Sequence, residues 1–182
     1  MHVVAWRHRG LRDAFEVAVV WPGDDEVRIE GQVTGDEEGP FSVRYVIDAD
    51  VRWVTRRVEL DGLGGAGPGR LLLEHDGAGA WRVDGQEAPE LDGCLDVDLG
   101  ATILTNTLAI RRLGMNVGGA GDLRAVWVSE DLETVEPAPQ RYERIHDDRY
   151  DFVALDSGER YPLVVDTDGF VVTYPNLAER LR

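Results

Sequence analysis

Stretches in which apolar and polar residues alternate recur along the whole chain. Val27–Thr34 reads Val-Arg-Ile-Glu-Gly-Gln-Val-Thr, and a period of two is typical of a strand with one buried face. Glycine-containing turn sequences such as Asp76-Gly and Asp156-Ser-Gly separate these stretches. Further stretches of this kind are Phe41–Ile47, Val51–Leu60, Arg70–His75, Ala80–Asp84, Cys94–Leu99, Leu123–Ser129, Arg141–His146, Arg149–Leu155, Arg160–Val165 and Phe170–Tyr174. The pattern predicts a mostly antiparallel β-roll or open barrel with a strongly curved sheet.

Helix is expected in two short segments only. Thr105–Leu113 is one, and the tail after Pro175 is the other, where Asn176–Leu181 has the composition for one or two turns. No linker divides the chain, and 182 residues suit one domain of ordinary size. We therefore expect residues 1–182 to form a single β-rich domain with very little helix.

The charge balance restricts the partners. The chain has 35 acidic and 19 basic residues, for a formal charge of −16, and all the basic residues are arginine. An acidic surface repels nucleic-acid phosphates and anionic lipid headgroups, so we expect no nucleic-acid partner and a preference for neutral over phosphorylated head groups. A lysine-free acidic composition also suits a salt-adapted proteome, without any functional meaning.

Neither a membrane-spanning segment nor a leader is expected. The longest apolar runs are about five residues, far below the roughly 20 that a spanning helix needs. The first nine residues contain Arg7 and Arg9 and no long apolar stretch, so a cytoplasmic location is expected. The single cysteine, Cys94, excludes an internal disulfide, and we expect it to be a small buried side chain. Nothing in the sequence predicts an oligomeric state.

Two motifs are interpreted as turns. Gly62–Gly67 has the spacing G-x-G-x-x-G, but a strand pattern follows it instead of the helix that would hold a pyrophosphate, so it predicts a hairpin loop. Asp166–Gly169 resembles the start of a calcium loop, but the position of the bidentate glutamate falls on Leu177. No cofactor and no metal are therefore expected.

Two segments of the chain resemble each other. Val46–Thr55 and Val164–Thr173 are identical at five of ten positions, and each reads as a strand, an Asp-x-Asp turn and a second strand. Either a duplicated β-unit or two ordinary hairpins in a chain rich in valine and aspartate would produce this.

A carboxylate pair carries the strongest chemical signal. Asp96 and Asp98 lie two residues apart on a predicted strand, so both project from one face. They form either a solvated acidic face or a pair neutralised by Arg111 or Arg112. The intervening segment 100–113 mixes threonines and an asparagine with apolar residues, which suits a pocket lining or a turn that caps its own backbone.

Candidate acid–base groups are few. His146 is followed by two aspartates and could act as a general base. The histidines have no metal-ligand spacing, and no serine lies in a nucleophile elbow. A small-molecule enzyme that uses His146 or the Asp96/Asp98 pair, and a scaffold domain without a ligand, therefore stay open as alternatives.

The segment around the carboxylate pair also resembles a known family. Asp96–Thr102 followed by Thr105–Leu113 looks like the signature of the putative glycolipid-binding family, formerly a domain of unknown function, and Val51–Val58 and Asp166–Leu177 agree with it. The resemblance implies a β-rich roll or open barrel, likened to bacterial carriers that hold acyl chains or glycolipids in an apolar cavity. It implies no established catalytic residue.

We therefore expect non-enzymatic binding of an amphiphile such as a glycolipid or long-chain lipid in an apolar cavity. Its polar head would contact side chains of one segment, namely Asp96, Asp98, Thr102, Thr105, Asn106, Thr107, Arg111 and Arg112. Sugar rings could stack on tryptophans, for which the candidates are Trp6, Trp21, Trp53, Trp81 and Trp127, although core packing is the commoner role of each.

Overall fold

The computed structural model describes residues 1–10, 13–36, 39–64 and 69–181. Its elements are β1 (His2–His8), β2 (Asp13–Pro22), β3 (Glu26–Asp36), β4 (Pro40–Asp50), β5 (Thr55–Gly64), β6 (Gly69–His75), β7 (Trp81–Val83), β8 (Gln86–Glu87), the 3₁₀ helix η1 (Pro89–Leu91), β9 (Asp96–Leu99), α1 (Thr105–Leu113), β10 (Ala120–Val128), β11 (Val135–His146), β12 (Arg149–Ala154), β13 (Arg160–Val165), β14 (Val171–Tyr174) and β15 (Ala178–Arg180). This content confirms the mostly β prediction.

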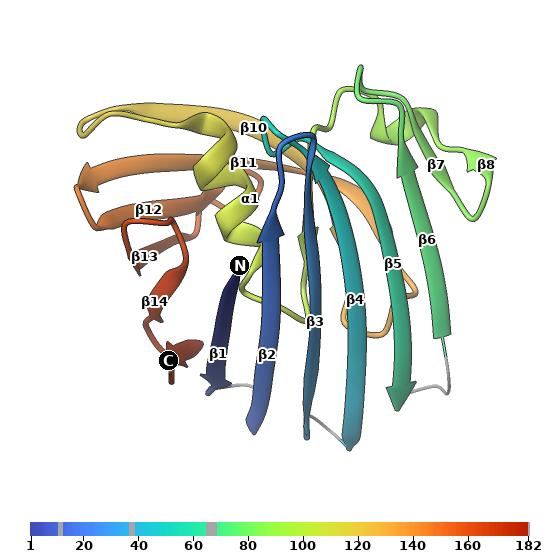
Figure 1. Cartoon of the computed structure of the whole chain (residues 1–182), viewed down its shortest axis with the longest axis horizontal. Coiled ribbons are helices and arrows are strands. Elements are labelled where there is room, and N and C mark those ends of the chain that lie inside the picture. The colour runs from blue at the N-terminus through green and yellow to red at the C-terminus, as the bar shows by residue number, and fades with distance from the viewer. Residues whose placement is uncertain (11–12, 37–38, 65–68, 182) are drawn as a thin grey trace.

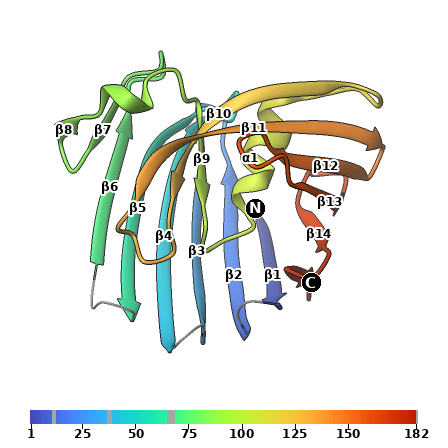
Figure 2. The ribbon, with the colours of Figure 1, turned by 180° about the vertical axis from the view of Figure 1, so that it is seen from behind.

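All the described strands belong to one sheet. Their order is β8-β7-β6-β5-β4-β3-β2-β1-β15-β14-β13-β12-β11-β10-β9, and every pair is antiparallel except β9 with β10. The sheet curls so that β1–β6 form one wall and β10–β14 form the other, with α1 between them (Figures 1 and 2). Near the β9 edge, the Thr55 amide donates to the Leu95 carbonyl at 3.0 Å, which ties this edge to the start of β5. The result is an open roll, as predicted.

The inner face of the roll is filled by side chains. Trp6, Tyr45, Ile47 and Leu73 from the first wall are fully buried, and so is Leu108 of α1. Cys94 is also buried, as predicted. Because α1 occupies the centre, the apolar interior serves as a packed core.

The candidate tryptophans divide into two groups. Trp6, Trp53 and Trp81 are buried. The indole nitrogen of Trp6 donates to the Val171 carbonyl, and that of Trp81 donates to the Cys94 carbonyl. Trp21 is exposed on β2 and Trp127 is half-buried on β10.

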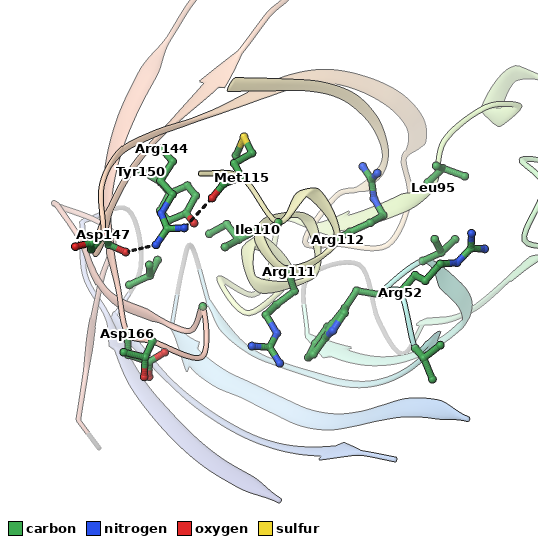
Figure 3. A pocket seen from close by; sticks show the side chains of 17 residues that line it. Arg52, Leu95, Ile110, Arg111, Arg112, Met115, Arg144, Asp147, Tyr150 and Asp166 are labelled. Carbon is green, nitrogen blue, oxygen red and sulfur yellow. Dashed lines mark hydrogen bonds between the residues drawn. The ribbon is translucent and has the colours of Figure 1, made fainter. Parts of the chain in front are cut away.

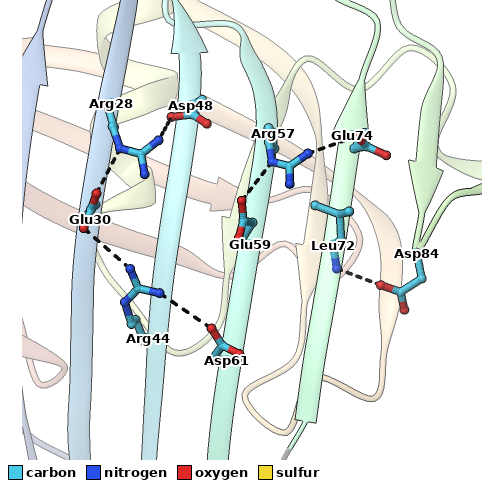
Figure 4. Close-up of polar contacts among 10 residues, drawn as sticks. All are labelled: Arg28, Glu30, Arg44, Asp48, Arg57, Glu59, Asp61, Leu72, Glu74 and Asp84. Atoms are coloured by element: carbon cyan, nitrogen blue, oxygen red, sulfur yellow. Dashed lines mark hydrogen bonds and ion pairs between the residues drawn. The ribbon is translucent and has the colours of Figure 1, made fainter.

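The outer face of the first wall carries a network of ion pairs between neighbouring strands (Figure 4). Each arginine in it contacts two carboxylates, at least one of them on an adjacent strand. The groups are Arg28 with Glu30 and Asp48, Arg44 with Glu30 and Asp61, and Arg57 with Glu59 and Glu74. These side chains are partly exposed, between 22% and 51%, so each pair is worth about 0–1 kcal/mol. The pairs that join two strands favour the observed register.

The sequence-based prediction was wrong in two places. Asn176–Leu181 is not helical, because β15 completes the sheet by pairing with both β1 and β14. Residues 51–54 of the predicted strand Val51–Leu60 form the turn between β4 and β5. In addition, β1, β2, β8 and β15 were not among the predicted strands. The Gly62–Gly67 motif joins the antiparallel neighbours β5 and β6, and residues 65–68 lie outside the described residues.

Candidate functional site

The predicted ion pair forms between β9 and α1. Arg112 Nε donates to Asp96 Oδ1 at 2.8 Å, and Arg112 Nη2 donates to Asp96 Oδ2 at 2.5 Å. The Asp96 side chain is 1% exposed and the Arg112 side chain 16%. Burial raises the pKa of Asp96, and the hydrogen bonds from Arg112 oppose that shift. The sequence left open a solvated acidic face or a carboxylate neutralised by an arginine, and the structure confirms the second for Asp96, with Arg112 as the partner.

Asp98 has other partners. Gln140 Nε2 donates to its Oδ2 at 2.6 Å, and Thr105 Oγ1 donates to its Oδ1 at 3.2 Å. Burial raises the pKa of Asp98, and these two donors oppose the rise. The carboxylate thus joins β9, β11 and the first turn of α1, in a place where a ligand would have to displace protein contacts.

A buried carboxylate that the sequence analysis missed anchors the start of α1. Glu16 on β2 is fully buried, and His8 Nε2 lies 2.8 Å from its Oε2. The hydroxyls of Tyr45 and Thr102 both donate to Glu16 Oε1, the first at 2.6 Å, and the Ile103 amide donates to Oε2 at 3.4 Å. Burial and the Glu16 charge raise the pKa of Tyr45 well above its usual range. A carboxylate here also suits the positive end of the helix dipole.

The remaining polar residues of the segment bond mainly within the protein. The Thr102 hydroxyl accepts from the Leu104 amide at 3.0 Å, and Asn106 Nδ2 donates to the Ile103 carbonyl at 3.0 Å. Tyr142 donates to Asn106 Oδ1 at 2.8 Å. Thr107 is fully buried, and its hydroxyl has no partner in the part of the chain that the structure describes. Self-capping, the second interpretation of this segment, is therefore what the structure shows.

A cleft of about 1070 Å³ opens beside the last turn of α1 (Figure 3). It is bounded by the β4–β5, β11–β12 and β13–β14 turns and by the end of α1. Its lining mixes apolar side chains with arginines: Val51, Arg52, Trp53, Val54, Leu95, Ile110, Arg111, Arg112, Gly114, Met115, Arg144, Asp147, Tyr150, Val165, Asp166, Thr167 and Gly169. Arg111 and Arg112 are thus the two predicted site residues that reach it.

Two arginines of the cleft rest on aromatic rings. The guanidinium carbon of Arg111 lies 4.7 Å from the centre of the Trp53 ring, and that of Arg144 lies 5.6 Å from the centre of the Tyr150 ring. Arg144 also donates to the carbonyls of Met115 at 2.7 Å and Asp147 at 2.9 Å. Stacking of this kind fixes the plane of a guanidinium and leaves its edge for other partners.

The turn that holds Trp53 is strained. The Asp50 side chain accepts from the Val54 amide, and Trp53 follows with a φ of 66°. The turn that starts at Asp166 has the same hydrogen bonds, and there the matching residue is Gly169, with a φ of 81°. A positive φ on a bulky residue costs about 1–2 kcal/mol, so Trp53 is held against a local preference that glycine satisfies without cost.

This comparison also bears on the resemblance between the two segments. The sequence match aligns Asp48 with Asp166, whereas the equivalent turn residues are Asp50 and Asp166, two positions away. A third turn, which starts at Asp76, has the same side-chain bonds. The shared shape therefore follows the aspartate-capped turn rather than the register of the sequence match.

The structure does not bring the candidate acid–base groups together. His146 is exposed at the end of β11, whereas Asp96 is buried beneath Arg112. Neither they nor Asp98 line the cleft. Among the described residues, no group of three or more His, Cys, Asp or Glu side chains is placed to hold a metal ion. None of the helices in those residues has the length and apolar character to cross a membrane.

The comparisons with known proteins agree with this fold. A family model described as putative glycolipid-binding matches residues 3–180. The chain belongs to this family. A crystal structure of a DUF1089 family protein from Pseudomonas aeruginosa is 31% identical, with a TM-score of 0.80 over 91% of this chain and 92% of that one. None of the curated proteins compared with the chain matches it. The family that the motifs indicated is thus confirmed.

Several cleft residues of this family member, among them Arg144 and Tyr150, were not predicted as site residues. Trp53 was named only as one of five candidate stacking tryptophans, because its stretch Val51–Val58 reads as a continuous strand and gave no sign of a turn. Arg144 and Tyr150 lie on strands that read as ordinary amphipathic ones. Only the curvature of the sheet brings them to α1, and no local sequence signal encodes that approach.

Proposed function

We propose that this protein binds an amphiphile such as a glycolipid in the cleft beside α1, without catalysing a reaction on it. The observation that carries the proposal is the mixed lining, in which aromatic-stacked arginines lie beside apolar side chains that are mostly buried, with Val51 exposed and Leu95 half-buried. Sites for small amphiphilic ligands combine apolar walls with a few fixed polar donors in this way. The family description is consistent with a binding role.

The apolar part of the ligand would lie along the cleft rather than inside the roll. The centre of the roll is filled by α1 and its neighbours, including the buried Leu104 and Leu108. In the cleft, the exposed Val51 and the half-buried Leu95 supply apolar contact, and the buried Ile110 forms part of the wall. The ligand would thus gain affinity from an alkyl chain that the cleft removes only partly from water.

The predicted site residues divide into two roles under this proposal. Arg111 would donate to the polar head, because its guanidinium is stacked but not otherwise bonded among the described residues. Arg112 borders the cleft, with its donors directed at Asp96. The other predicted residues, Asp98, Thr102, Thr105, Asn106 and Thr107, would position α1 rather than touch ligand.

A chain-length series tests this proposal. Octyl, decyl and dodecyl glucosides, titrated below their micelle concentrations and followed by calorimetry and by the melting temperature, should bind progressively tighter and then level off. The gain is at most about 0.8 kcal/mol for each buried methylene, because burial beside an open cleft is partial. Native mass spectrometry with lipid extraction would identify a co-purified ligand. If no glucoside raises the melting temperature at ligand excess, the proposal fails.

A matched pair of variants locates the site. Val51 lines the cleft and is 52% exposed, whereas Val3 lies on β1 outside the cleft and is 57% exposed. Threonine has the shape of valine but replaces a methyl with a hydroxyl. Val51→Thr should weaken dodecyl glucoside about fivefold, which corresponds to roughly 1 kcal/mol for one apolar group, and Val3→Thr should not. Equal effects of the two variants would contradict the assignment of the cleft.

A further inference from the structure

We infer that the polar end of this ligand is anionic, and that a phosphate or carboxylate group is held by Arg111 and Arg144. The inference rests on the proposed function, since it names the head group of an amphiphile in the same cleft. It goes against the preference for neutral head groups that the net charge alone predicts.

Arg111 is held in a fixed position but has no anionic partner among the described residues. It lies in the last turn of α1, and its guanidinium carbon lies over the Trp53 ring, 4.7 Å from the ring centre. A Cβ on Gly169 would lie 3.3 Å from Arg111 Cδ, so this glycine leaves the room that the arginine stem occupies. Among the described residues, no carboxylate is paired with this guanidinium. Two strained or glycine-dependent turns thus fix an arginine whose charge is not neutralised.

Arg144 is held by neutral groups. Its Nη1 donates to the Met115 carbonyl, its Nη2 to the Asp147 carbonyl, and its Nε to the His146 carbonyl at 3.4 Å. Carbonyl oxygens satisfy hydrogen-bond donors but leave the unit charge in place. A guanidinium has five N–H donors, so two are left for another acceptor. Asp147 gives Arg144 its backbone oxygen and not its carboxylate.

The other charged pairs at the cleft show what makes these two arginines different. Each of those pairs contains one cleft-lining residue and a partner of opposite charge. They are Arg112 with Asp96, Asp166 with Arg180, and Arg52 with Asp50. A chain with a charge of −16 has acidic side chains to spare, yet none described here pairs with Arg111 or Arg144. A bound anion would supply the missing charge, through the charge-assisted bonds that guanidinium groups form with phosphate and carboxylate.

Amphiphiles of one chain length and different head groups test the inference. Decyl glucoside is neutral, decyl glucuronide carries a carboxylate, and decyl phosphate carries a phosphate. We expect the two anionic compounds to bind at least tenfold tighter than the glucoside at 50 mM salt, with the difference shrinking at 500 mM salt because the charges are screened. If the glucoside binds and the anionic compounds bind no tighter, the inference is wrong and the proposed function stands. If none of the three binds, both fail.

A titration with inorganic phosphate distinguishes an anionic head group of an amphiphile from a free anion. Phosphate alone should bind far more weakly than decyl phosphate, because it lacks the apolar contact. Equal binding of the two would assign the arginines to a free anion and overturn the head-group inference.

Variants assign the effect to the arginines. Arg111→Gln should reduce the ratio of affinities for decyl phosphate and decyl glucoside about tenfold, and Arg111→Lys, which keeps the charge, should restore part of it. Arg144→Gln should act in the same direction, with its melting temperature recorded because it also loses carbonyl contacts. Arg82→Gln is the control, since Arg82 is on β7 outside the cleft. An unchanged ratio in Arg111→Gln would overturn the inference.

Discussion

Removing the Arg112 side chain should destabilise the protein strongly. The variant Arg112→Ala leaves Asp96, whose side chain is 1% exposed, without the guanidinium that donates to both of its oxygens. Breaking a buried ion pair in this way costs about 3–5 kcal/mol, because the remaining charge is neither solvated nor paired. The entropy of unfolding of 182 residues at about 2.1 cal/mol/K each is about 380 cal/mol/K, so the melting temperature should fall by about 8–13 °C.

An exposed pair of the same chemistry provides the control. Arg141 donates to both oxygens of Asp122, at 2.5 and 3.0 Å, and these side chains are 40% and 57% exposed. Arg141→Ala should cost about 0–1 kcal/mol and lower the melting temperature by less than about 3 °C. Calorimetry or thermal circular dichroism at one pH and salt concentration measures both variants. If Arg112→Ala loses no more stability than Arg141→Ala, burial does not control the energy of this pair.

A double variant separates the two contributions. Replacing both charges, as in Asp96→Val with Arg112→Met, removes the unpaired carboxylate as well as the pair. Much of the stability lost in Arg112→Ala should then return, since apolar pairs often replace buried ion pairs at little cost. A double variant as unstable as Arg112→Ala would mean that packing around Arg112, rather than charge, explains the loss.

Three further predictions concern stability. Since burial raises the pKa of Asp98 above its ordinary value of 3.8, its contribution to stability is complete at lower pH and is lost as the pH rises through the raised pKa; Asp98→Asn should therefore flatten the pH dependence of the unfolding free energy above about pH 4, and an unchanged slope would contradict this. Glu16→Ala should lower stability by more than about 3 kcal/mol in denaturant titrations, because several buried donors lose one acceptor. Gly169→Ala and Gly85→Ala both place a side chain at positive φ, but only at Gly169 would the new Cβ meet Arg111, so Gly169→Ala should cost more than the about 1–2 kcal/mol expected of Gly85→Ala in the same titrations.

The pairing of Asp96 could be predicted because it depends on two local rules. Residues two apart on a strand share a face, and an acid that faces inward needs a cation, which Arg112 offers sixteen positions later. The location of the cleft depends on no such rule. Its lining comes from turns far apart in the sequence, and the curvature that brings them together results from the accumulated twist of many strands.

The strand β2 shows a second feature that could not be predicted from the sequence, namely which of its side chains face inward. Phe15 and Val17 are exposed, whereas Glu16 is buried on the inner face together with Ala14 and Ala18, so both faces of this strand carry apolar side chains. Alternation alone gives no reason to place the acid on the buried face. Two side chains stabilise the buried acid, namely His8 on the adjacent strand β1 and Tyr45 on β4, which lies beyond β3, and neither shares a motif with it. The helix predicted for Asn176–Leu181 was wrong because the pairing of β15 with β1 and β14 outweighs the helical propensity of this segment.

The position of β15 determines how the two halves of the roll come together during folding. From β1 to β8, and again from β10 to β15, each strand pairs with its neighbour in sequence, so both meanders can form from nearby residues. The seam between β1 and β15 joins Trp6 to Arg180 across most of the chain, and closing so large a loop is entropically the most demanding step. Because the cleft takes its Val51–Val54 turn from the first meander and Arg144 from the second, it is complete only once this seam has closed. Amide hydrogen exchange at the seam should therefore slow when a ligand fills the cleft.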